Sequence, residues 1–159
     1  LLVALHLARR RPVSKYETWG PKITALLGLT IAYFVLLLPR AAVDPWWDSL
    51  SVALIVGGNA LCVLVVMDLG RSLSIMPEAR KLVTSGFYSR IRHPLYLAEE
   101  IAFCGLFLQF RSWQAAMILL VQFYFQIRRM DWEEGILARA FPDYAAYQRR
   151  SHRLVPGFY

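Results

Sequence analysis

The segment GFYSRIRHPLYLAEEIAFCGLFLQF, residues 86–110, joins a dense polar cluster directly to one of the most apolar runs of the chain. The ionisable side chains of its first half include Arg90, Arg92, His93, Glu99 and Glu100. Pro94 suits the first turn of a helix, because the N–H that proline lacks would have no helical partner there. The segment therefore predicts a helix that begins at a polar boundary and continues into apolar surroundings.

The composition is that of a membrane protein rather than of a soluble domain. Hydrophobic residues make up 57% of the 159 residues, whereas soluble chains usually contain about 45–50%. The formal net charge of +7 could indicate nucleic acid, but no basic polar domain is visible and we expect no nucleic-acid partner. Cys62 and Cys104 lie inside apolar runs without metal or redox spacing, so both are predicted to be buried apolar side chains.

Five apolar runs predict membrane-spanning helices, since a hydrocarbon core about 30 Å thick requires about 20 helical residues. These runs cover residues 1–8, 23–38, 46–67, 95–110 and 113–127. The first is interpreted as the end of a truncated helix, and the last two are short enough to require tilt, a thinned bilayer or partial insertion. Only Arg111 and Ser112 separate those last two runs, which predicts a tight helical hairpin.

The predicted fold is an all-α polytopic membrane helical bundle of about five transmembrane helices, followed by a cytoplasmic C-terminal helical segment. The fifth helix is expected to continue as far as Ala140, and Pro142 to break it before a further helix at residues 143–150. Pro77 and Gly86 delimit a further segment, which leaves room for a short helix between them.

The distribution of cations predicts the orientation of these helices. Every Lys and Arg except Arg40 and Arg111 lies between the first and second runs, between the third and fourth, or after the fifth. The positive-inside rule places those three segments in the cytoplasm, which accounts for the net charge without nucleic acid. The opposite ends of the spans carry Trp46, Trp47 and Trp113, as expected for an interfacial aromatic belt.

Polar residues inside the predicted spans have two interpretations. Glu99 and Glu100 either complement the N-terminal dipole of their helix, or are paired or face a cavity, because unpaired carboxylates are costly in a membrane. Gly57 and Gly58 are expected to allow close helix packing. Asn59 either shares that packing or lines a cavity.

The segment after the fifth run carries two candidate functional faces. Arg129 and Glu133 are four residues apart and can pair on one side of a helix, whereas the adjacent Glu134 points elsewhere. A second face could stack on a planar ring or lie at the level of the lipid headgroups, and it carries Tyr144, Tyr147 and Arg150.

Two stretches together resemble the isoprenylcysteine carboxyl methyltransferase family, a group of integral-membrane methyltransferases that includes phospholipid methyltransferase relatives. They are LVTSGFYSRIRHPLYLAEE at residues 82–100 and RRMDWEEGILARAFPDYAAYQRRSHRLVP at residues 128–156. The resemblance covers about half of the chain, residues 69–156, and the combined order and spacing of its motifs are fairly specific. Pro142 is a departure, since the family often has Gly after the corresponding Phe.

The resemblance implies a methyltransferase that uses S-adenosyl-L-methionine without a Rossmann domain and acts on a lipophilic small-molecule or lipid acceptor. The residues expected to bind the cofactor are His93, Tyr96, Leu97, Glu134, Tyr147 and Arg150. Glu134 would meet its amino group, and Tyr147 and Arg150 would close the pocket or meet its carboxylate. Arg129 and Glu133 match the catalytic pair, which would orient the acceptor and balance its charge.

In this interpretation residues 1–67 form an N-terminal transmembrane part, and residues 68–159 form the catalytic part, with the active site facing the cytoplasm. A membrane NADPH-dependent reductase of the sterol-reductase type is an alternative, because those proteins share an RHP-like segment; a non-catalytic membrane scaffold is another. The acceptor is open between a prenylated thiol-carboxylate, a phospholipid amine, a small thiol and another lipid. No metal site is expected, since the three His residues form no zinc pattern, and no obligate protein partner is inferred.

Overall fold

The computed structural model describes residues 12–72 and 78–157, and most of these residues are helical. The helices are α2 (Trp19–Thr30), η1 (Ile31–Leu37), α3 (Pro45–Leu69), η2 (Gly70–Ser72), η3 (Gly86–Ser89), α4 (Pro94–Phe110), α5 (Trp113–Ala140) and α6 (Tyr144–Arg150). The predicted helical bundle is confirmed for this part of the chain. The first predicted run, residues 1–8, lies outside the described residues.

The prediction of an all-α chain is wrong at one place. Strands β1 (Ser14–Lys15) and β2 (Glu78–Ala79) pair antiparallel, with Ser14 opposite Ala79 and Lys15 opposite Glu78. The described residues 78–85, where a short helix had room to form, are therefore not helical. Two of these residues instead pair with a segment more than sixty positions earlier, a contact that local sequence signals do not encode.

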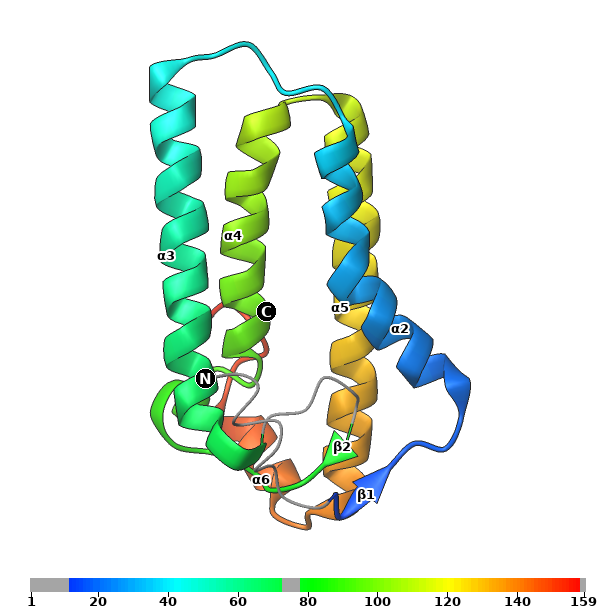
Figure 1. Cartoon of the computed structure of the whole chain (residues 1–159). Helices are drawn as coiled ribbons and strands as arrows, with labels where there is room; N and C mark the ends of the chain where they lie inside the picture. The colour runs from blue at the N-terminus through cyan, green and yellow to red at the C-terminus, as the bar shows by residue number, and fades with distance from the viewer. Residues whose placement is uncertain (1–11, 73–77, 158–159) are drawn as a thin grey trace.

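The long helices form two packed pairs (Figure 1). Helix α3 lies beside α4, and α2 with η1 lies beside α5, while α6 and the small sheet gather at the end of the bundle where α5 finishes. The start of α3 is fixed by Asp44, whose side chain accepts hydrogen bonds from the backbone N–H of Trp46 and Trp47, with Pro45 in the first turn. The helix stops at Gly70, whose φ of 51° is left-handed.

Small residues set the close approach of α3 and α4. A Cβ atom added at Gly58 would lie 2.7 Å from the backbone N of Ala102, and one added at Gly105 would lie 2.8 Å from the carbonyl oxygen of Ser51. Ser51 also donates a 2.7 Å hydrogen bond to the Gly105 carbonyl. The predicted packing role is thus confirmed for Gly58 and is wrong for Gly57, because a Cβ atom added there would have no described atom within 4 Å. Asn59 is exposed and donates to Ile55 of its own helix.

The predicted hairpin between α4 and α5 is formed. Arg111 adopts a left-handed backbone conformation with a φ of 37°, and the Ser112 side chain accepts a hydrogen bond from the N–H of Ala115 at the start of α5. The Arg111 guanidinium donates to the Ala42 carbonyl at 2.6 Å. The turn between α4 and α5 is therefore tied to the loop that precedes α3.

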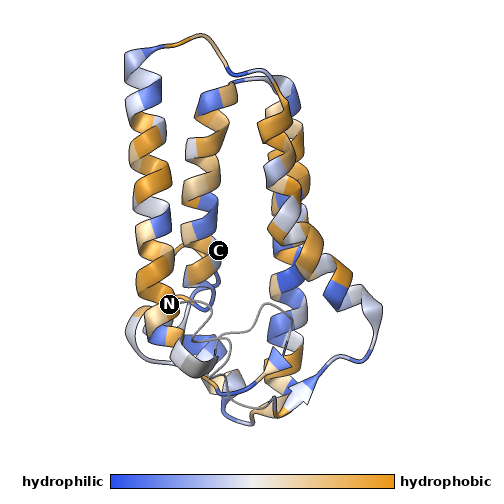
Figure 2. Ribbon diagram, viewed as in Figure 1, coloured by the Kyte–Doolittle hydropathy of each residue, from blue (hydrophilic) through white to orange (hydrophobic). Residues whose placement is uncertain are grey.

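Two helical stretches are long and apolar enough to cross a membrane by length and composition. They are Trp19–Leu37, with 19 residues, and Pro45–Leu69, with 25. Helix α4, with 17 residues, is about 26 Å long, and the number of spanning helices stays a prediction. Figure 2 shows apolar residues along much of the helices and polar ones concentrated at the end that carries α6. Exposed apolar side chains of α3 include Val52, Val56, Val63, Leu64 and Met67, an outer surface that suits lipid better than water.

Candidate active site

The polar end of the bundle is organised around the carboxylate of Glu134, on the last turns of α5. Its Oε1 lies 3.0 Å from His93 Nε2, 3.0 Å from Arg92 Nε and 3.4 Å from Arg153 Nε. Its other oxygen accepts a 3.2 Å hydrogen bond from Gln148. Burial raises the pKa of this carboxyl, but the hydrogen bonds and charges of these cations outweigh burial and lower the pKa to about 2.

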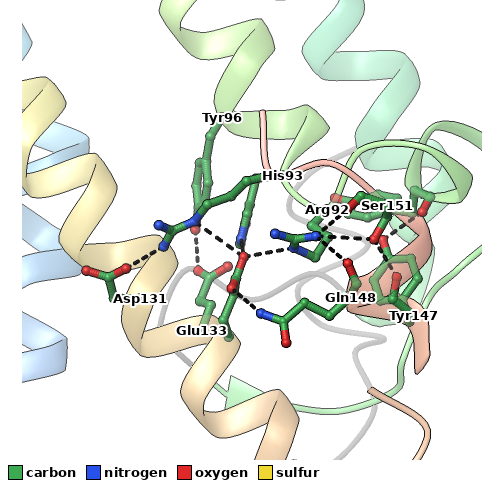
Figure 3. A network of polar contacts seen from close by, with 11 residues as sticks. Arg92, His93, Tyr96, Asp131, Glu133, Tyr147, Gln148 and Ser151 are labelled. Atoms are coloured by element: carbon green, nitrogen blue, oxygen red, sulfur yellow. Dashed lines mark hydrogen bonds and ion pairs between the residues drawn. The ribbon is translucent and has the colours of Figure 1, made fainter. Parts of the chain in front are cut away.

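Backbone hydrogen bonds join the segment before α4 to the C-terminal tail. The N–H groups of Arg92 and His93 donate to the carbonyls of His152 and Arg153 at 2.8 and 3.1 Å, and the His152 N–H donates to Arg90 at 2.8 Å. The Arg92 side chain adds bonds to the carbonyls of Gln148 and Ser151. Figure 3 shows Arg92 between the start of α4 on one side and Tyr147 and Gln148 of α6 with the following Ser151 on the other. Residues 90–93 and 148–153, some sixty positions apart, are thus held together around Glu134, and we call this group the polar platform.

The predicted catalytic pair is adjacent to this platform. Arg129 Nε lies 3.4 Å from Glu133 Oε1, and the Tyr96 hydroxyl donates to the same oxygen. Arg129 is only 4% exposed, and its guanidinium lies 4.8 Å from the centre of the Tyr96 ring. The His93 ring also stacks on the Tyr96 ring, and the two ring centres are 5.4 Å apart. The pairing expected from the four-residue spacing is therefore present.

A pocket lies between the β2 segment, the start of α4, the end of α5 and α6. Five of the predicted site residues line it, namely His93, Tyr96, Arg129, Glu133 and Tyr147. Its volume of about 110 Å³ is below the roughly 300–1,000 Å³ typical of sites that enclose a whole small molecule. A nucleoside-sized ligand therefore requires its lining side chains to move apart.

The other three predicted site residues have different surroundings, and their roles stay predictions. Leu97 packs against the apolar cluster that contains Met130 and Leu154. Glu134 is already engaged by the cations of the platform, and Arg150 lies 5.9 Å from the centre of the Tyr147 ring on the exposed side of α6. None of the three lines the pocket.

Two tyrosines of α6 are buried against the pocket. Their ring centres are 6.0 Å apart, as expected for residues three positions apart on a helix. The Tyr147 hydroxyl donates a 2.6 Å hydrogen bond to the Tyr88 carbonyl, and burial raises its pKa to about 12. The Tyr144 hydroxyl is buried and has no hydrogen-bond partner among residues 12–72 and 78–157, so it is open to a ligand.

Several residues of this site could not be identified from local patterns. Arg92 contacts Glu134, Gln148 and Ser151, which are 42 to 59 positions away. Arg80 lines the pocket from a segment in which the sequence marks only a Pro and a Gly as boundaries. The available signal was the density of cations before Pro94, which indicated a polar site without indicating its partners.

The carboxylates within α4 are paired across to α5, which decides between their two interpretations. Gln126 donates to Glu99 at 2.6 Å and Gln122 donates to Glu100 at 3.1 Å, and both glutamines are fully buried. Gln122 also approaches the Gly28 carbonyl of α2 at 3.4 Å. These bonds connect the two helix pairs in the apolar part of the bundle, where unpaired carboxylates would be costly.

The described part of the chain therefore combines two helical stretches that are long and apolar enough to cross a membrane with a pocket at one end of the bundle that is lined by both charged and apolar side chains. The family model for phospholipid methyltransferases matches residues 47–144, more than half of the chain. The chain therefore belongs to the phospholipid methyltransferase family, which confirms the resemblance to integral-membrane methyltransferases.

Two curated relatives are similar over much of the chain. The cobalt-zinc-cadmium resistance protein CzcN of Cupriavidus metallidurans is 34% identical over 110 residues, which cover 67% of this chain and 46% of that protein. The nickel-cobalt-cadmium resistance protein NccN of Alcaligenes xylosoxydans xylosoxydans is 30% identical over 132 residues, which cover 80% and 61%. The chain thus spans about half of the length of the curated relatives it matches.

Proposed function

We propose that the chain is an S-adenosyl-L-methionine-dependent methyltransferase that methylates a lipophilic acceptor at the cytoplasmic surface of a membrane. The observation that carries this proposal is the position of the Arg129–Glu133–Tyr96 group in the wall of the pocket, within the region that the methyltransferase family model matches. A soluble cofactor and a membrane-embedded acceptor can meet only at such a boundary between polar and apolar parts of the protein.

The pocket residues suit this cofactor in chemical character. Tyrosine rings can pack against an adenine ring, and the carboxylate of Glu133 can face a sulfonium. The Tyr144 hydroxyl, which has no hydrogen-bond partner among the described residues, offers a hydrogen bond. When bound, the cofactor supplies a methyl group activated on positively charged sulfur. The chain itself must hold the acceptor in line with that methyl group and exclude water, which is a matter of positioning.

The residues of the pair have complementary roles in this proposal. Arg129, buried between Tyr96 and Glu133, fixes the direction of the Glu133 carboxylate. Glu133, of which 23% of the side chain is exposed, remains accessible to the nucleophilic group of the acceptor and balances charge there. Glu134 acts at one remove, since it holds Arg92, His93 and the tail in place around the pocket.

The same proposal places the chain across the membrane several times. The two apolar stretches Trp19–Leu37 and Pro45–Leu69 would span it, and α4 with the apolar half of α5 would form a shorter hairpin. The cations around α6 would face the cytoplasm by the positive-inside rule. The relatives are named for metal resistance, but the described residues contain no group of three or more His, Cys, Asp or Glu that could hold a metal ion, and metal binding is not part of the proposal.

The test is ligand binding followed by turnover, with the full chain in lipid nanodiscs. S-adenosylhomocysteine is expected to raise the melting temperature and NADPH to leave it unchanged; the reverse would favour the reductase. Incubation with tritiated S-adenosylmethionine and a membrane lipid extract should label a lipid, and mass spectrometry should identify a product heavier by one methylene group. Glu133→Gln should abolish the labelling with the fold retained, whereas Glu17→Gln, the same change at an exposed position, should not.

A further inference from the structure

Arg80 and Tyr144 provide two buried donors among the residues that line the pocket, and neither belongs to the pair or the platform described above. From this arrangement, and resting on the proposed function, we infer that they bind an anionic oxygen group of the ligand, either the carboxylate of the cofactor's amino-acid moiety or a phosphate of the acceptor.

Arg80 is buried in a way that leaves part of its guanidinium unused. Only 3% of its side chain is exposed, and Nη2 pairs with Glu78 Oε2 at 2.5 Å. Nε is fully buried and has no hydrogen-bond partner within the described part of the chain. An unfilled donor on a buried guanidinium is costly, and an oxyanion in the adjoining pocket would satisfy it.

Tyr144, the first residue of α6, supplies the second donor. The residue is 2% exposed, and its hydroxyl also lacks a partner among the described residues. Burial raises its pKa above the usual value, so the hydroxyl stays protonated and can donate to an anion. The Tyr147 hydroxyl does not offer a second donor to the anion, because it already donates to the Tyr88 carbonyl. Arg150 does not line the pocket.

The charge of the lining also favours an anionic group. Its cationic side chains are Arg80, Lys81, Arg92 and Arg129, against the two carboxylates of Glu78 and Glu133. Glu133 belongs with the Arg129 pair, whereas Arg80 and Lys81 enter from the β2 segment. The lining thus carries a carboxylate for a sulfonium on α5 and a surplus of cations on the β2 side for an oxyanion.

The test compares a ligand that carries the amino-acid moiety with one that lacks it. Isothermal titration is done on wild type, Arg80→Gln and Tyr144→Phe with S-adenosylhomocysteine and with 5′-methylthioadenosine, which lacks the amino-acid moiety. A carboxylate site predicts that Arg80→Gln weakens the first ligand by about 10- to 100-fold and leaves the second unchanged. Arg80→Lys should recover part of the loss, and Arg149→Gln, an exposed position on α6, should have no effect.

A phosphate site predicts instead unchanged affinity for S-adenosylhomocysteine, with a raised KM for the lipid acceptor and loss of the thermal shift that inorganic phosphate gives to the wild type. If neither ligand nor acceptor responds to Arg80→Gln or Tyr144→Phe, the inference is overturned while the proposed function stands. A third outcome is that the wild type binds neither nucleoside but does bind phosphate, and that Arg80→Gln no longer binds phosphate. In that case the proposed function fails and the anion site remains. Should Arg80→Gln not fold, Tyr144→Phe carries the same comparison, with about a tenfold effect expected.

Discussion

Replacing Glu134 with Gln should reveal how much of the stability of the polar end depends on one carboxylate. Burial raises the pKa of Glu134, yet His93, Arg92 and Arg153 together lower it from 4.5 to about 2. That fall corresponds to about 3.4 kcal/mol of preference for the charged form in the folded state. Solvent reaches 14% of the side chain, so screening leaves about 2–3 kcal/mol. Glu134→Gln should therefore lower the melting temperature at pH 7 by about 5–10 °C.

The pH dependence of the melting temperature distinguishes a loss of the Glu134 charge from a simple loss of packing. Because the folded-state pKa is lowered, the stabilisation is complete above the unfolded value of 4.5 and is lost as the pH falls through about 2. The gap in stability between wild type and Glu134→Gln should be constant from pH 7 to about pH 5. It should narrow steadily below that range.

The assay is thermal unfolding followed by tryptophan fluorescence in detergent micelles across this pH range. Glu17→Gln, at an exposed position, controls for removal of a carboxylate as such and should behave as the wild type. Equal melting temperatures at pH 7, or a gap that persists unchanged to pH 2, would refute the reasoning, because the stabilisation would not then come from the charge of Glu134.

Three further substitutions test the packing and the local geometry, each by thermal unfolding against a matched control. Gly58→Leu should cost about 3 kcal/mol or more, because its side chain would collide with Ala102 of α4, whereas Gly57→Leu, with no atom within 4 Å of the added Cβ, should change stability by less than about 0.5 kcal/mol. Gly86→Ala should lower the free energy of unfolding more than Gly70→Ala, although both glycines have a positive φ. Only at Gly86 would the new Cβ lie 2.0 Å from Asp68 Oδ2, and it would displace that oxygen from its hydrogen bond with the Phe87 N–H. Tyr147→Phe should cost about 1–2 kcal/mol by leaving the Tyr88 carbonyl without its donor, while Tyr124→Phe, 57% exposed, should be neutral.

The helices were predictable where the signal is local. The run at residues 46–67 became α3 (Pro45–Leu69), since Asp44, Pro45 and Gly70 mark its ends in the sequence itself. The extension of α5 to Ala140 and the pairing of Arg129 with Glu133 follow from helical spacing in the same way. In these cases the residues that decide the structure lie within a few turns of one another.

The remaining parts depend on contacts that spacing cannot encode. The β1–β2 pair is only two residues long in each strand, and no alternating pattern of that length stands out from a loop. Glu134 was expected to point away from Glu133, which is correct, but nothing local indicates that it meets Arg92, 42 residues earlier. The pocket depends on local helical spacing and on long-range contacts. The lining residues Arg129 and Glu133 on α5 were therefore predictable, whereas the lining residues of the β2 segment were not.

The arrangement of the polar end explains how a site can form at helix ends without a glycine-rich loop or a parallel sheet. The backbone bonds of Arg92 and His93 fix the tail to the start of α4, and Glu134 fixes both to α5. Glu133, the preceding residue on α5, lines the pocket together with Tyr144 and Tyr147 of α6, so a displacement of α6 would move one wall relative to the Arg129–Glu133 pair. Substitutions in this network should therefore change affinity and turnover together, whereas those between α3 and α4 should act on stability first, because their contacts lie away from the pocket.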